Sequence, residues 1–207
     1  MTHLFDESYR REVADRCGAF CRTIGEAPLA LKRAAVAIAL CETADGRAGF
    51  LLTRRAASLR AHSNQWALPG GRCDEGETAI EAALRELDEE LGLRLDAEDT
   101  LGILDDYPTR SGYLITPVVV WAGSCAEIRP NPAEVASVHR IPLAEIMRED
   151  AVDFVVSPES GRQVVRVWIE GNHIHAPTAA LIYQFREVLA GRATRVADLE
   201  QPRFAWR

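Results

Sequence analysis

The segment from Gly71 to Leu93 constrains this chain more than any other, because it gathers glutamates and an arginine around one short helix. Its sequence is GRCDEGETAIEAALRELDEELGL. Residues 78–91, TAIEAALRELDEEL, lack Gly and Pro and are rich in Ala, Leu and Glu, which favour helix. Gly92 follows directly and is typical of a helix C-terminus. The segment therefore predicts a helix over residues 78–91.

The two faces of this helix differ in chemistry. At about 100° per residue, Glu86 and Glu90 lie one turn apart on one face, with Glu89 on the adjoining flank. Carboxylates directed at one point repel one another, and a bound divalent cation would reverse that repulsion. Hard oxygen ligands without paired Cys or His favour Mg²⁺ or Mn²⁺ over Zn²⁺. The opposite face is apolar and is expected to pack on a sheet: Ala79, Ala83, Leu84, Leu87 and Leu91.

A run of glutamates is most often a solvated acidic helix face. The glycine-rich lead-in and the fixed spacing favour a metal site over that alternative. Arg85 is placed to pair with Glu77 or with a ligand carboxylate, so it is expected to fix the rotamers of the site rather than to contact a substrate.

Every fixed position of the pattern GX5EX7REUXEEXGU, with U a bulky aliphatic residue, is filled from Gly71 to Leu93. The chain therefore resembles the Nudix hydrolases. The resemblance implies an α/β/α sandwich around a mixed sheet and hydrolysis of a nucleoside diphosphate linked to another group. It also implies that Glu86, Glu89 and Glu90 hold the metal, with the Gly71 carbonyl as a further ligand. The general base stays open between a box glutamate and Glu134, whose alternative is an ordinary surface glutamate at a strand start.

A second resemblance precedes the box. Residues 51–71 follow LLTXR(S/A)X3RX3GX3FPGG, the signature of the coenzyme A diphosphatase branch, with Asn64 in place of Gly and Leu68 in place of Phe. This resemblance covers residues 31–148 well and implies coenzyme A or acyl-coenzyme A as the substrate. The Trp-Gly-x-Thr-Ala stretch that usually opens the last helix of that branch survives only as Thr178-Ala179. The choice between acylated and free coenzyme A is therefore open.

Basic side chains cluster just before the box at Arg54, Arg55, Arg60 and His62. They are candidate donors to the diphosphate and to the separate 3′-phosphate of coenzyme A. The alternative is that some of them are solvated or pair with neighbouring Asp and Glu. Arg60 is the strongest candidate, because it occupies a fixed place in the signature.

Two other functions remain open from the sequence. The departures at Asn64, Leu68 and the last helix favour a Nudix enzyme for ADP-ribose, dinucleotides or damaged nucleoside triphosphates. A catalytically silent nucleotide sensor is a third reading, but it has no need for all of Glu86, Glu89 and Glu90.

Composition bounds the class of protein. The 207 residues are 47% hydrophobic, which suits one sizeable core. A net charge of -7 argues against general nucleic-acid binding. No long apolar run or signal-peptide core is present, so we expect a soluble, cytoplasmic protein that binds no membrane. The 5 cysteines are expected to be reduced, and a homodimer is left open.

The periodicity of the chain predicts a mixed α/β order. We expect an N-terminal helical extension over residues 1–30, a catalytic domain over 31–190 and a loose arginine-rich tail over 191–207. The predicted helices are 3–25, 78–91, 143–148 and 178–189. The predicted strands are 34–41 and 49–53 as a hairpin, 100–106, 113–122, 134–141, and a second hairpin of 162–169 with 173–175. Residues 54–70 are expected to form a polar loop.

Overall fold

The computed structural model describes residues 3–23, 31–57, 65–124 and 127–202. Within them the helices are α1 (Glu7–Ala19), α2 (Ala79–Leu91), α3 (Leu143–Met147) and α4 (Thr178–Leu189), with single 3-10 turns at Ala97–Asp99 and Glu149–Ala151. The strands are β1 (Lys32–Glu42), β2 (Ala48–Arg55), β3 (Trp66–Ala67), β4 (Gly70–Arg72), β5 (Thr100–Ile103), β6 (Tyr107–Pro108), β7 (Tyr113–Trp121), β8 (Val135–Pro142), β9 (Val152–Val156), β10 (Gln163–Ile169) and β11 (Asn172–His175).

The main sheet is mixed, as the resemblance implied. Its central order is β3-β2-β1-β7-β5, while β4 pairs with β1, β6 with β7 and β8 with β2. The pairing of β1 with β7 is parallel and runs from Lys32 opposite Tyr113 to Leu40 opposite Trp121. The predicted hairpin of β1 and β2 is present, with Leu40 opposite Phe50. β1 therefore lies at the centre of the sheet, which explains why its sequence is almost continuously apolar.

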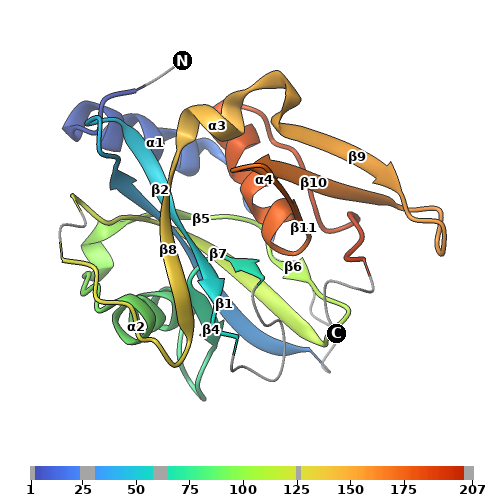
Figure 1. Ribbon diagram of the computed structural model, residues 1–207, viewed down its shortest axis with the longest axis horizontal. Helices are drawn as coiled ribbons and strands as arrows, with labels where there is room; N and C mark the ends of the chain where they lie inside the picture. Colours follow the sequence, from blue (N-terminus) through green and yellow to red (C-terminus); the bar gives the residue numbers. More distant parts are fainter. Residues whose placement is uncertain (1–2, 24–30, 58–64, 125–126, 203–207) are drawn as a thin grey trace.

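Helices cover both faces of this sheet, so the predicted α/β/α sandwich is confirmed. Figure 1 shows α2 below the main sheet and α1 and α4 above it, with the small sheet β9–β11 beside α4. Ala35, Ala37 and Ala39 of β1 face α2, where Leu87 and Leu91 pack. Alternate residues of the same strand face the opposite core, which α1 and α4 share; Ile38, Leu40, Val13 and Phe185 belong to it. The α1 helix is thus part of the main core rather than an appended element.

The ends of α2 are set by local chemistry. Thr78 caps the N-terminus, its hydroxyl accepting from the Glu81 N–H at 3.2 Å while the Glu81 carboxylate accepts from the Thr78 N–H at 2.8 Å. Gly92 ends the helix in the left-handed region at φ 66°. These caps explain why the sequence located this helix to within one residue of its observed start.

The tail does not form the loose segment that the sequence predicted, at least over residues 191–202. Val196 is fully buried, and Glu200 and Gln201 are also buried. Arg195 Nη1 lies 2.9 Å from Asp105 Oδ2, and the Tyr107 hydroxyl donates to the Leu199 carbonyl at 2.8 Å. The expectation was wrong because these arginines pair with carboxylates on distant elements, a relation that local composition does not reveal.

Further segments differ from the sequence-based expectation, among them the predicted strand 100–106, which ends at Ile103 and is followed by β6 at Tyr107–Pro108. The N-terminal helix is shorter than 3–25, and its C-terminal residue is Ala19. The expected loop 54–70 begins with the last residues of β2 and contains β3 at Trp66–Ala67. β9 was not predicted; it pairs antiparallel with β10, with Val156 opposite Gln163 and Val152 opposite Val167.

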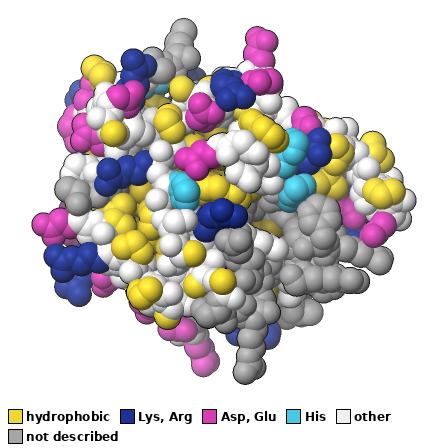
Figure 2. Space-filling view, viewed as in Figure 1, with side chains coloured by type: hydrophobic (Ala, Val, Ile, Leu, Met, Phe, Trp, Pro, Cys, Tyr) yellow, Lys and Arg dark blue, Asp and Glu magenta, His cyan; other side chains and the backbone are white. Residues whose placement is uncertain are grey.

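The surface agrees with the acidic composition. On the face drawn in Figure 2, acidic and basic side chains are interspersed. Among the described residues, no helix is long and apolar enough to cross a membrane.

Candidate metal centre and active site

Three carboxylates converge beside the N-terminal end of β8. Glu86 and Glu90 come from α2, and Glu134 comes from the residue before β8; each offers an oxygen, and these oxygens lie within 4.8 Å of one another. The main chain of Glu134 is held in place, because its carbonyl accepts from the Ala56 N–H at 2.8 Å and its N–H donates to the Asn131 carbonyl at 3.0 Å. Residues from two distant segments therefore form one acidic cluster.

Burial makes this cluster costly without a cation. Glu90 is only 4% exposed, and burial, with the charge of Glu86 next in size, raises the pKa of Glu90 to about 8. Burial also raises the pKa of Glu86, although the hydrogen bond from Arg85 opposes that shift. Oxygen-only ligands that repel one another fit a hard divalent cation, which would neutralise them.

The glycines of β4 make room for the cluster. A Cβ atom on Gly71 would lie 2.2 Å from Glu86 Oε1, so a side chain at this position would displace the carboxylate. A Cβ atom on Gly70 would lie 2.3 Å from the Ala35 carbonyl oxygen. The Gly70 N–H donates to Glu90 Oε2 at 3.3 Å. The close approach of β4 to α2 therefore requires Gly71, and its close approach to β1 requires Gly70.

Arg85 ties the cluster to its surroundings, as its spacing from Glu77 predicted. Its Nε donates to Glu77 Oε1 at 2.9 Å, and its Nη1 donates to Glu86 Oε1 at 3.0 Å and to Glu89 Oε2 at 2.9 Å. Its Nη2 donates to the Arg72 carbonyl at 2.9 Å and to Glu77 Oε2 at 3.1 Å. The hydrogen bond with Glu77 is the main reason why the pKa of Arg85 is raised and that of Glu77 is lowered. One guanidinium thus orients three carboxylates and the backbone of β4.

Glu89 stands apart from the other two glutamates expected to bind metal. Its side chain is 54% exposed and pairs with Arg85. The described cluster contains Glu134 where the sequence placed Glu89. A metal role for Glu89 and for the Gly71 carbonyl stays a prediction.

A β-bulge separates the two arginines at the end of β2. The pairing of β2 with β8 shifts register between Arg54 and Arg55. The Arg54 guanidinium lies over the Trp66 ring, 5.2 Å from its centroid. The charge of Arg55 lowers the pKa of Glu90, and Arg55 Nε is buried without a partner among the described atoms. Among the four basic residues predicted to bind phosphate, Arg55 is therefore the one whose charge acts on the acidic cluster, whereas Arg60 and His62 lie outside the described residues.

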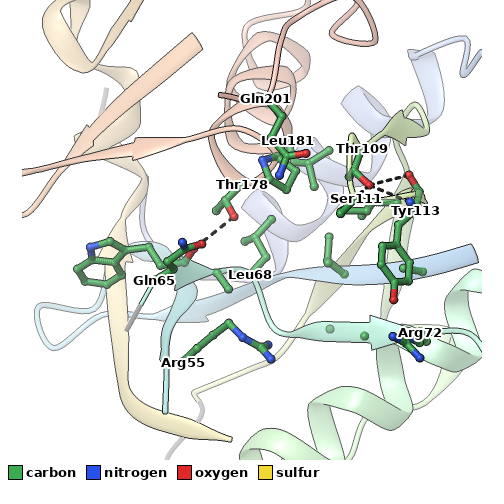
Figure 3. Close-up of a pocket in the computed structure, with 18 residues that line it drawn as sticks. Arg55, Gln65, Leu68, Arg72, Thr109, Ser111, Tyr113, Thr178, Leu181 and Gln201 are labelled. Atoms are coloured by element: carbon green, nitrogen blue, oxygen red, sulfur yellow. Dashed lines mark hydrogen bonds between the residues drawn. The ribbon is translucent and has the colours of Figure 1, made fainter. Parts of the chain in front are cut away.

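A cavity of about 240 Å³ adjoins the cluster on the α4 side of the sheet. Gly70 and Gly71 line it and also contact the glutamates. Figure 3 shows Arg55 and Arg72 at one side of this cavity, with Thr178, Leu181 and Gln201 across from them. Gln201 was not predicted as a site residue, because it belongs to the segment expected to be loose.

Comparisons with known proteins agree with this geometry. The family model described as NUDIX domain matches residues 31–158, more than half of the 207-residue chain. The Uncharacterized Nudix hydrolase NudL of Photorhabdus laumondii is 36% identical over 141 residues, which span 67% of this chain and 75% of that protein. The protein of the same name from Escherichia coli strain K12 is 36% identical over 138 residues, spanning 65% of this chain and 71% of that protein.

Solved structures show the same fold. RenU, a Nudix hydrolase from M. smegmatis, aligns with a TM-score of 0.51 and 24% identity, covering 77% of this chain and 86% of that one. A MutT/nudix family protein from Enterococcus faecalis aligns with a TM-score of 0.50 and 17% identity, covering 89% of this chain and 73% of that one. With the complete box and the acidic cluster, the family match establishes that the chain belongs to the Nudix family and is a diphosphate hydrolase.

Proposed function

We propose that this Nudix enzyme hydrolyses coenzyme A or acyl-coenzyme A to 3′,5′-ADP and 4′-phosphopantetheine or its acylated form, with Mg²⁺ or Mn²⁺. The main support is structural: residues of the signature at 51–71 lie against the acidic cluster of Glu86, Glu90 and Glu134. Arg55, from the first part of the signature, lines the cavity beside β4, and its charge lowers the pKa of Glu90. Gly70 and Gly71, from the end of the signature, contact Glu90 and Glu86.

Glu86 and Glu90 would hold the cation, and Glu89 and the Gly71 carbonyl are further candidate ligands. The chemistry that a divalent cation supplies at such a site is neutralisation of the diphosphate and a lower pKa for the attacking water. Arg55 would donate to a diphosphate oxygen, since its buried Nε has no partner among the described atoms. Arg60 and His62 are further proposed phosphate donors, and Arg54 is a weaker one because it lies over Trp66.

Glu134 is the proposed general base. Its carboxylate lies close to both Glu86 and Glu90, and Asn131 Nδ2 donates to its Oε1 at 3.3 Å. That contact orients the carboxylate while leaving its second oxygen to accept a proton from water. Glu134→Gln would lower kcat more than it weakens Mg²⁺ binding if Glu134 is the base. A parallel loss of both quantities would assign it to the metal instead.

The substrate is tested with purified protein and Mg²⁺ on coenzyme A, ADP-ribose, NADH and 8-oxo-dGTP, with products separated by chromatography. We expect the highest kcat/KM for coenzyme A. Brisk cleavage of ADP-ribose without cleavage of coenzyme A would instead support the alternative that Asn64, Leu68 and the altered last helix favour. Binding without cleavage of any compound in the panel would support a nucleotide sensor.

A further inference from the structure

The cavity beside β4 is placed to receive a group attached to a bound diphosphate. It shares Gly70 and Gly71 with the acidic cluster, so the two sites are separated only by the backbone of β4. Arg55 belongs to both, because it lines the cavity and its charge acts on Glu90. A diphosphate held at the cluster would therefore have one of its two organic groups at the mouth of this cavity.

The charge of the cavity is uneven. Among its described lining residues, Arg55 and Arg72 are the charged ones, and both lie toward β4. The opposite wall is uncharged and consists of Thr178, Leu181 and Gln201 (Figure 3). No carboxylate or further cation lines the described part of the cavity.

Arg110, the basic residue of the turn that carries Thr109 and Ser111, is already paired with a carboxylate. Arg110 lies between two lining residues, and its guanidinium forms an ion pair with the buried Glu200. Its backbone N–H donates to Gln201 Oε1 at 3.1 Å, which holds the Gln201 side chain at the cavity wall. The wall thus offers amide and hydroxyl groups together with apolar surface, and no net charge.

The two halves of coenzyme A differ in charge. The nucleotide half carries a 3′-phosphate, and burying that dianion against the uncharged far wall, across the cavity from Arg55 and Arg72, is strongly unfavourable. The pantetheine half carries no charge and consists of two amides, a hydroxyl, aliphatic groups and a terminal thiol, which match an uncharged wall with amide, hydroxyl and apolar side chains. We infer that this cavity binds the pantetheine arm of coenzyme A and that the 3′-phospho-ADP half lies outside it. The inference rests on the proposed function, because it assigns an orientation to that substrate.

Ser111→Trp tests the orientation, since Ser111 is exposed and lines the cavity. An indole at this position would obstruct the cavity, and it would remove the hydrogen bond that the Ser111 hydroxyl donates to Thr109 Oγ1 at 3.0 Å. Ser8→Trp is the matched control, because Ser8 is also exposed but lies in α1 and does not line the cavity. Calorimetry would measure binding of 4′-phosphopantetheine and of 3′,5′-ADP in Mg²⁺. Neither compound contains a diphosphate, so binding is read without turnover.

Ser111→Trp is expected to raise the Kd for 4′-phosphopantetheine by about tenfold or more, because the arm loses its place in the cavity, and to change the Kd for 3′,5′-ADP by less than about twofold. Ser8→Trp should change neither. A larger loss for 3′,5′-ADP, an equal loss for both, or no loss for either would overturn the orientation. If the unaltered protein does not cleave coenzyme A, the proposed function is wrong, and this outcome is measured separately from the orientation.

Discussion

Glu90 is a carboxylate placed where burial and neighbouring charge both oppose its ionisation. It is 4% exposed, and Glu86 and Glu134 lie beside it. Proteins retain such groups mainly where function requires them, because a buried unpaired charge costs stability. The position of Glu90 is therefore the strongest single-residue evidence that α2 serves a reaction and not only the core.

Glu90→Gln should preserve the fold and lower kcat by about 100-fold or more, because it removes the charge of a proposed metal ligand while keeping its volume. In the absence of metal its Tm should be at least that of the unaltered protein, since folding no longer has to suppress the ionisation of Glu90. Steady-state kinetics and thermal melts measure the two effects. Glu98→Gln, at an exposed position, serves as the control. Near-normal turnover of Glu90→Gln in saturating Mg²⁺ would contradict the assignment of Glu90 as a metal ligand.

Arg85→Lys should lower both kcat and the affinity for Mg²⁺ by about 10-fold to 100-fold, because lysine retains the charge but not the planar fork. The arginine bonds to Glu77, Glu86 and Glu89 at once. Arg94→Lys is a matched control, since Arg94 pairs with Asp88 near the end of the same helix and its side chain is 86% exposed. Equal activity in the two variants would show that the geometry of Arg85 is irrelevant.

At the scale of elements, the sequence located those whose signals are local. α2 was found from its composition and Gly92, and α4 from its amphipathic pattern over residues 178–189. β9 was missed because its sequence, VDFVV, is a strand only through its pairing with β10. β3 and β4 are too short to show a period, yet β4 carries the glycines of the site.

In the same way, the site contacts within one segment were predictable from the sequence, and those between distant segments were not. The contact of Arg85 with Glu77 follows from spacing along one segment. The exposed direction of Glu89 and the approach of Glu134 depend on how α2 packs and where β8 begins, which are tertiary facts. The wall that Gln201 contributes to the cavity depends on long-range pairing of the tail and could not be read from composition.

The pairing of the tail with α4 makes a prediction about pH. Arg192 Nε donates to Glu187 Oε2 at 2.6 Å, and this hydrogen bond is the main cause of the lowered pKa of Glu187. A folded-state pKa below the unfolded value contributes stability above the unfolded value, and that stability is lost as pH falls through the folded value.

Arg192→Ala should therefore lower Tm by about 2–4 °C at pH 7, which corresponds to roughly 1 kcal/mol in a chain of this size. The difference from the unaltered protein should shrink as pH falls below the unfolded value of 4.5 for Glu187. Thermal melts across this range measure it. Arg129→Ala is the control, because Arg129 pairs with Glu127 and both side chains are at least 80% exposed. A difference that does not change with pH would rule out the contribution of Glu187.

At the scale of the whole molecule, the main sheet separates the acidic cluster from the cavity, and the proposed reaction needs both. The α2 face carries the acidic cluster, and the α4 face carries the cavity. The backbone of β4 connects them, because Gly70 and Gly71 contact both. The tail lines the cavity through Gln201, so residues from β1 to the tail contribute to one site.

Divalent metal should stabilise this arrangement as a whole. A ligand at about 100 times its Kd stabilises the folded state by about 2.7 kcal/mol, which raises Tm by about 5–10 °C in a chain of this size. Mg²⁺ or Mn²⁺ should produce this shift in the unaltered protein and a much smaller one in Glu90→Gln. Equal shifts in both proteins would place the bound metal elsewhere.

The most direct test of the central claim is mass spectrometry of the products formed from coenzyme A and Mg²⁺ in ¹⁸O-labelled water. Cleavage of the diphosphate predicts 3′,5′-ADP and 4′-phosphopantetheine, with a single ¹⁸O atom in one of the two phosphates, and almost no product from Glu90→Gln. Release of dephospho-coenzyme A and inorganic phosphate, or no product from the unaltered protein, would contradict the claim.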